Sequence, residues 1–274
     1  MNIRPQSTTA EGLVVEVIDN GQVSGQQFLV VGLCMFFNML DGFDITAMAV
    51  VAGAVSADLS LSPEKLGWIF SFALMGMMAG AMFLAPASDI IGRRKTIILA
   101  MVLVGASILL TARASTLIEF IVLRFVSGLG AGAMMASQAT LAAEYSPDKY
   151  RSLSVAAVMA GYPMGAMVTS VVAGFVMPGY GWPGMFVFGG ILTLSMVAVA
   201  WLLLPESLKF LFQRRPASAL ERINKILRKL ERDTLAELPV VQAAEDGAKA
   251  GLLATMLKLL ARDHLRTTLT LWST

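Results

Sequence analysis

Residues 28–51 read FLVVGLCMFFNMLDGFDITAMAVV, and the only charges in this run are Asp41 and Asp44. A helix of about 20 mainly apolar residues crosses the ~30 Å hydrocarbon core of a bilayer. The run exceeds the roughly 10 residues of a membrane barrel strand, and it lacks strict alternation of apolar and polar residues. The stretch therefore predicts a membrane-spanning helix.

Five more runs of this kind follow, at 67–87, 96–112, 117–141, 154–177 and 185–204. The composition agrees, because 56% of the 274 residues are hydrophobic and 15% are charged, against about 45–50% and about 25% in soluble domains. One soluble core cannot absorb this much apolar surface. We predict an all-α membrane protein with a six-helix transmembrane bundle over 28–204. Cys34 is the single cysteine, which excludes a disulfide scaffold.

The distribution of Lys and Arg predicts the orientation, since cytoplasmic loops carry the basic excess. With the N-terminus inside, 18 of the 21 basic residues are cytoplasmic, Lys65 and Arg113 lie outside, and Arg124 lies within a span. We therefore expect a multi-pass protein of the cell inner (plasma) membrane with a cytoplasmic N-terminal segment over 1–27. Because the basic residues sort by membrane side, no nucleic acid partner is expected.

A polar stretch follows the sixth span, and we assign 205–264 to a cytoplasmic inter-domain linker. Within it, Ser218-x-x-Glu221 has the form of a capping box and predicts the start of an amphipathic helix. This helix either lies on the inner leaflet or is a solvated or domain-packed linker helix, and the sequence leaves both open. Residues 265–274 turn apolar again and predict the start of a truncated seventh span.

Charges within the spans are the strongest functional signal, because an Asp or Arg at a helix centre costs roughly 2.5–3.5 kcal/mol on insertion scales. Asp41 and Asp44 project from one face of the first helix, and they lie at a depth similar to that of Arg124 in the fourth. We predict that they share a cavity that binds substrate or a proton, with Gly42 in its wall. The alternative is an ion pair that only holds helices together. Glu119, near the outer edge, is expected to reach water or Arg113.

Glycines four residues apart predict close helix packing in lipid, at Gly76 and Gly80, Gly128 and Gly132, and Gly161 and Gly165. Two cytoplasmic loops predict a hinge whose charges pair and unpair as helices move. The residues of this gating loop are Asp89, Gly92, Arg93 and Arg94 in the first loop, with Glu144 and Arg151 around the second.

Together these motifs resemble the N-terminal half of a major facilitator superfamily transporter, over about residues 25–215. The resemblance rests on the 89–95 loop, on Arg124 with Gly128, Gly130 and Gly132, on Glu144-x-x-Pro147-x-x-x-Arg151, and on Pro205-Glu206-Ser207. Asp41-Gly42-Phe43-Asp44 is similar to the first-helix motif of the aromatic acid:proton symporter family. Two positions depart from the loop motif, Ala85 in place of Gly and Ile90 in place of Arg. The segment 161–165 lacks the Gly-Pro pair of drug antiporters, which favours symport.

The resemblance implies half of a twelve-helix fold that works by alternating access. It implies proton-coupled symport of a small organic anion, an aromatic carboxylate such as a benzoate or hydroxybenzoate. Arg124 would attract the substrate carboxylate, and Asp41 and Asp44 would bind or relay the proton. The expected partners are the anion, the proton, the lipid bilayer, and a missing C-terminal six-helix half or a second copy of the chain. No metal or organic cofactor is suggested.

Three other functions stay open at this point. One is an inactive or assembly-dependent half-carrier fragment, and another is a superfamily carrier for a different small metabolite. An intramembrane enzyme is disfavoured, because the sole histidine, His264, lies outside the spans and no zinc-protease or nucleophile-elbow motif occurs. We therefore expect no enzymatic activity.

Overall fold

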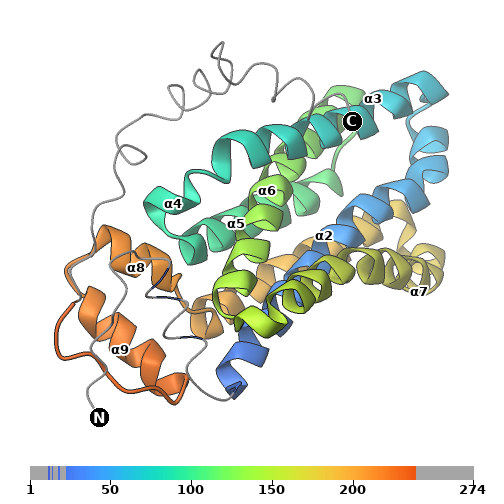
Figure 1. Cartoon of the computed structure of the whole chain (residues 1–274). Coiled ribbons are helices and arrows are strands. Elements are labelled where there is room, and N and C mark those ends of the chain that lie inside the picture. The colour runs from blue at the N-terminus through green and yellow to red at the C-terminus, as the bar shows by residue number, and fades with distance from the viewer. Residues whose placement is uncertain (1–11, 13, 15–17, 19–22, 239–274) are drawn as a thin grey trace, which may run out of the picture.

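The chain is helical throughout the part that the structure describes, and that part contains no strand. The structure is a computed structural model that describes residues 12, 14, 18 and 23–238. Its elements are α2 (Gly25–Asp58), α3 (Pro63–Ala79), η1 (Gly80–Leu84), α4 (Ser88–Ile91), α5 (Arg93–Thr111), α6 (Leu117–Glu144), α7 (Asp148–Leu203), α8 (Leu208–Arg214) and α9 (Ala219–Lys229). The long helices pack into one bundle, and α8 and α9 lie at one end of it (Figure 1). The predicted all-α class is confirmed.

Four elements match the first four predicted spans. They are α2, the continuous α3 and η1, α5 and α6, and each is long and apolar enough to cross a membrane. The π-helix η1 extends α3 to Leu84 by one wider turn, in which the N–H of Ala85 bonds to the carbonyl of Gly80 at 2.9 Å. The fifth helix, α7, has 56 residues, which as a straight helix would measure about 84 Å. It is therefore too long for a single crossing.

α7 turns back on itself at Gly181, whose backbone has φ 63° and ψ −167°. A Cβ on Gly165 would overlap the backbone of Met39, and a Cβ on Gly189 would meet the ring of Phe43. These contacts lie one turn apart on α2, whereas 24 residues separate them on α7, or about 36 Å of straight helix. The two arms of α7 are therefore antiparallel (Figure 1). The predicted spans 154–177 and 185–204 fall on either side of Gly181, so six spans are confirmed.

The predicted glycine pairs lie where helix backbones touch. A Cβ on any of six glycines would overlap the backbone of the facing helix, namely Gly76 and Gly80 against α6, Gly128 and Gly132 against α3, and Gly161 and Gly165 against α2. In lipid, such contacts replace the hydrophobic effect as the force between helices, because they allow close van der Waals packing. The glycines thus fix α3 on α6 and the first arm of α7 on α2.

α3 and η1 form the least buried span, in which only Ile69, Gly76 and Gly80 are buried. Its exposed apolar side chains include Trp68, Leu74, Met75, Met78, Met82 and Phe83. A soluble protein rarely exposes so large an apolar surface, whereas a lipid-facing helix requires one. This exposure agrees with the multi-pass membrane class.

The linker helix α9 is amphipathic, as predicted, but the predicted capping box is wrong. Ser218 precedes the helix without making a side-chain cap hydrogen bond. The apolar face, with Ile223, Ile226 and Leu227, is buried in one cluster with Val14. A face that packs on protein is not available to the inner leaflet, so the structure favours the packed linker helix.

Several predictions concern residues that the structure does not describe. They are most of the N-terminal segment 1–27, the linker beyond residue 238, and the start of a seventh span at 265–274. The boundaries of these domains, and their cytoplasmic side, stay predictions.

The packing of α7 on α2 leads to a first prediction, tested with Gly165→Ala and the matched control Gly174→Ala. A methyl group at Gly165 overlaps the backbone of α2, whereas nothing lies within 4 Å of a Cβ at Gly174. We expect Gly165→Ala to lower the free energy of unfolding by about 1–3 kcal/mol, the cost of overpacking, and Gly174→Ala to leave it unchanged or raised. Denaturation in detergent micelles measures both. Equal stability of the two variants would contradict the contact.

Candidate functional site

The predicted charges of α2 and α6 meet inside the bundle. Nη1 of Arg124 donates a hydrogen bond to Oδ1 of Asp44 at 2.7 Å, and the side chains are 2% and 4% exposed. The two residues come from different helices, and this contact places them at the same level of the bundle, in agreement with the similar depth that the sequence predicts. A short charge-assisted bond of this kind is among the stronger hydrogen bonds in proteins.

Two further residues hold Arg124, and the sequence analysis missed both. Oγ1 of Thr111, at the end of α5, accepts a hydrogen bond from Nη2 at 3.2 Å and donates to the carbonyl of Ser107 at 2.8 Å. The ring of Phe186, in the second arm of α7, lies 5.2 Å from the guanidinium carbon, within cation–π range. α2, α5 and α7 therefore each contribute one contact to a side chain of α6.

Asp41 lies one turn before Asp44 on α2 and is equally buried. Neither of its carboxyl oxygens has a hydrogen-bond partner within the described residues. A buried carboxylate without partners is energetically costly. The two carboxyls are thus unequal, since one is ion-paired and the other is unpartnered.

Gly42, between the two carboxyls, lies in a helix contact. A Cβ on this residue would overlap the backbone carbonyl of Tyr162 in α7. Helix packing alone accounts for a glycine here, and its assignment to a cavity wall stays a prediction.

An aromatic cluster lies beside the ion pair. Phe120 lies one turn from Arg124 toward the predicted outer end of α6, and its ring centroid is 5.5 Å from that of Trp182 and 6.4 Å from that of Phe186. Nε1 of Trp182 also donates to Oδ2 of Asp58 at 3.0 Å, which ties the turn of α7 to the end of α2. The cluster therefore joins α6 to the second arm of α7 beside the ion pair.

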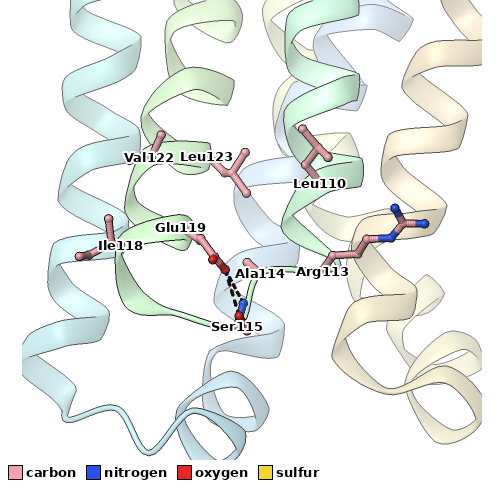
Figure 2. Close-up of a pocket in the computed structure, with 8 residues that line it drawn as sticks. All are labelled: Leu110, Arg113, Ala114, Ser115, Ile118, Glu119, Val122 and Leu123. Carbon is pink, nitrogen blue, oxygen red and sulfur yellow. Dashed lines mark hydrogen bonds between the residues drawn. The ribbon is translucent and has the colours of Figure 1, made fainter.

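A recess of about 430 Å³ lies between the C-terminal end of α5 and the N-terminal end of α6. Arg124, Asp41 and Asp44 do not line it. Figure 2 shows Glu119 pointing to Ser115 while Arg113 extends away from it. The Glu119 carboxylate accepts the backbone N–H of Ser115 at 2.7 Å and that of Thr116 at 3.2 Å. Glu119 thus caps α6 and is exposed, so of the two expected surroundings the structure favours water, and it shows no ion pair between Glu119 and Arg113.

At the opposite end of the bundle, three of the predicted gating residues meet. Nε of Arg93 donates to Oε1 of Glu144 at 2.9 Å, and its Nη2 lies 3.1 Å from Oδ1 of Asp89. The side chains of Arg93 and Glu144 are 10% and 9% exposed, whereas that of Asp89 is 63% exposed. The Arg93–Glu144 pair is therefore shielded, and Asp89 forms its rim.

Glu206 joins this network, although the sequence analysis quoted it only as part of a motif. Its Oε1 accepts the backbone N–H of Arg94 at 3.0 Å, in the first turn of α5, where the N–H groups lack helical partners. The same carboxylate abuts Gly92, whose φ is 104°. A side chain at this position would meet Glu206 and strain the backbone, which accounts for the glycine.

Neighbouring groups complete the network. The hydroxyl of Ser207 donates to Glu144, and that of Tyr145 donates to the carbonyl of Glu206 at 2.7 Å. Burial, together with the charges of Glu144 and Glu206, raises the pKa of Tyr145 well above its usual value, so the phenol remains a donor. Arg94 bonds to the carbonyl of Trp201 and lies 5.5 Å from its ring centroid.

Arg151 differs from the other predicted gating residues. Its ion pair in the described part of the chain is with Asp148, in the first turn of the same helix. The structure therefore does not bring it to Arg93 or Glu144 by an ion pair, and its part in a gate stays a prediction.

A bundle of apolar spanning helices that buries an ion pair and gathers a charged network at one end defines a multi-pass membrane protein of the transporter class. The chain belongs to the Major Facilitator Superfamily, which it matches over residues 31–272. It is related to carriers of aromatic acids. Over 246 residues it is 34% identical to the 4-hydroxybenzoate transporter PcaK of Pseudomonas putida, with 89% of this chain and 54% of that protein covered.

A gallate transporter of Pseudomonas putida is 34% identical over 206 residues, which cover 75% of this chain and 46% of that protein. Among solved structures, the proton:xylose symporter XylE of E. coli, bound to 6-bromo-6-deoxy-D-glucose, has a TM-score of 0.67 at 22% identity. That match covers 75% of this chain and 50% of the other, and it shows the fold. The chain spans about half the length of the curated relatives it matches.

The contacts of Arg124 lead to a second prediction, which ranks two substitutions by the stability that each of them costs. Asp44→Asn leaves a buried cation without its counter-charge, which costs about 3–5 kcal/mol, whereas Thr111→Val removes one neutral acceptor and costs about 1.5–3 kcal/mol. Thermal unfolding in detergent ranks them. Thr140→Val is the control, because the Thr140 hydroxyl bonds only to its own helix, at Ala136. A Thr111 variant as stable as this control would remove Thr111 from the site.

Proposed function

We propose that this chain forms the substrate- and proton-binding half of a proton-coupled symporter for a small aromatic carboxylate. The observation that carries the proposal is the buried Arg124–Asp44 pair with the unpartnered Asp41 one turn away. The relatives named for 4-hydroxybenzoate and gallate support the substrate class, since both compounds are aromatic acids.

Arg124 is the group we assign to the substrate carboxylate. A guanidinium carries five N–H donors in a planar fork that matches a carboxylate. In this structure two of its nitrogens donate to Asp44 and Thr111, while Nε has no partner among the described residues. Asp44 thus occupies the position that a substrate carboxylate would take, and binding consists of an exchange between the two.

Asp41 is the group we assign to the transported proton. It has no cation bonded to it, whereas Asp44 is paired with Arg124. A substrate anion that neutralises Arg124 leaves more uncompensated negative charge near both carboxyls, which favours protonation of the pair. Proton and substrate then stabilise each other, which is the thermodynamic requirement for symport.

We assign the gate to the charged network around Arg93 and Glu144. Opening the bundle toward the cytoplasm separates groups that are paired here, and such networks have two discrete arrangements. The gate comprises Asp89, Gly92, Arg93, Arg94 and Glu144, to which the structure adds Glu206.

Alternating access rocks two bundles about a central site, so we propose that this chain works with a second six-span bundle. The distribution of Lys and Arg supports insertion in the inner membrane with the N-terminus in the cytoplasm. If a separate chain or a second copy of this chain supplies that bundle, the chain is an assembly-dependent half-carrier.

The third prediction tests Arg124 with Arg124→Lys. Lysine keeps the charge but cannot bond Asp44 and Thr111 in a planar fork or stack on Phe186 in the same way. We expect uptake of labelled 4-hydroxybenzoate to fall at least about tenfold, the effect of losing about 1.4 kcal/mol of binding, while membrane insertion persists. The assay uses cells that produce the chain together with the second half of the PcaK transporter.

Cells that produce the chain alone are the control, and we expect no concentrative uptake from them. Wild-type affinity in Arg124→Lys would reduce Arg124 to a packing role. Accumulation by the chain alone, as a monomer, would overturn the need for a second bundle.

The fourth prediction separates the two carboxyls with Asp41→Asn and Asp44→Asn. An amide keeps the shape of the acid and does not titrate. We expect Asp41→Asn to abolish accumulation against a gradient while exchange of labelled for unlabelled substrate survives in part. Asp44→Asn is expected to lower stability and substrate binding together, because Arg124 loses its partner. Substrate-induced proton uptake by each variant is the measurement. Unchanged pH dependence in both would move the proton path to another part of the carrier.

A further inference from the structure

One turn before Asp41, α2 carries another buried polar residue, Asn38. Asn38 has no exposed surface, and its Nδ2 donates a hydrogen bond to the backbone carbonyl of Val158 in α7 at 2.7 Å. A buried side-chain amide in an apolar span is costly unless its groups are bonded. Asn38 meets this requirement on its nitrogen side alone.

The bond to Val158 fixes which way the amide faces. A carbonyl accepts hydrogen bonds and donates none, so the nitrogen of Asn38 must lie toward Val158 and the oxygen away from it. That oxygen, Oδ1, is buried and has no hydrogen-bond partner among the described residues. A fixed acceptor without a donor is thus held inside the bundle.

The carboxyl oxygens of Asp41 also lack hydrogen-bond donors. Residues three apart on a helix share a face, with Cβ atoms about 5–6 Å from each other, and both Oδ1 and Oδ2 of Asp41 are buried and unpartnered. Three acceptor oxygens therefore occupy one turn of α2, and the hydrogen bonds of the described residues bring no donor to them. Each unsatisfied buried group is energetically costly.

We propose that Asn38 is a positioning residue for the transported proton, whose Oδ1 accepts the hydrogen bond of the protonated Asp41 carboxyl. The inference rests on the proposed function. A proton on Asp41 converts one acceptor into an O–H donor, and this donor bonds to Oδ1 of Asn38 without displacing the Val158 contact. When the proton leaves, the Asp41–Asn38 bond is lost with it.

The other charged and titratable groups near this pair have separate roles. Asp44 and Arg124 are bonded to each other, and Tyr162 of α7 contacts Gly42 through its backbone while its phenol lies within electrostatic range of both carboxyls. Because Asn38 is bonded to α7, it holds the protonated Asp41 beside the contact between α2 and the first arm of α7. Asn38 thereby links the proton to a helix contact as well as holding it.

The fifth prediction uses the infrared carbonyl stretch of a protonated carboxyl, measured on the full chain in lipid vesicles between alkaline and acidic buffer. A band that disappears in Asp41→Asn belongs to Asp41. In Asn38→Leu we expect this band to move to higher wavenumber, because a carboxyl without a hydrogen-bond acceptor absorbs there. Asn38→Thr keeps an oxygen acceptor, so its band is expected to move less, and it serves if the Leu variant does not fold.

Gln138→Leu is the matched control. Gln138 is a fully buried amide of α6 without a hydrogen-bond partner among the described residues, and it lies 14 residues from Arg124, or about 21 Å along the helix. We expect its substitution to leave the Asp41 band in place. A band that stays unshifted in both Asn38 variants overturns the role of Asn38 alone. A band absent from the wild type at acidic pH overturns the proton site of the proposed function itself.

Discussion

The placement of one arginine in the apolar interior is the constraint on which the described structure depends. A charge at a helix centre costs roughly 2.5–3.5 kcal/mol on insertion scales unless partners surround it. Arg124 of α6 finds a carboxylate on α2, a hydroxyl on α5 and an aromatic ring on α7. The need to solvate one side chain therefore sets the relative depth and rotation of four helices.

Close packing at glycines allows the neighbouring helices to reach Arg124. A salt bridge of 2.7 Å between α2 and α6 requires that both helices sit close to their neighbours, and in lipid no hydrophobic force supplies that closeness. Gly128 and Gly132 seat α6 on α3, and Gly161 and Gly165 seat α7 on α2. Substituting larger residues would separate backbones by more than a hydrogen bond tolerates. The small residues and the charged residues are thus two parts of one arrangement.

The two charged sites lie on the same rigid elements. Arg124 and Glu144 are both on α6, 20 residues apart, or about 30 Å, and Thr111 and Arg93 are the two ends of α5. A tilt of these helices that separates Arg93 from Glu144 also acts on the contacts of Arg124. This shared scaffold physically connects the Arg124 site to the Arg93–Glu144 network, because both sites draw on the same two helices.

The amino-acid sequence by itself determined the helical class, the six spans and the charges within them, because length, apolarity and intramembrane charge are local properties. It also indicated the glycine contacts, since spacing by four defines a helix face. Tertiary structure alone decided which carboxyl is paired, since Asp41 and Asp44 share a face in sequence and differ only in what α6 brings to them. Thr111, Phe186 and Asn38 escaped notice because an isolated Thr, Phe or Asn in a span carries no pattern. Their roles arise from contacts across 13, 62 and 120 residues, and such distances are fixed by packing and not by local periodicity.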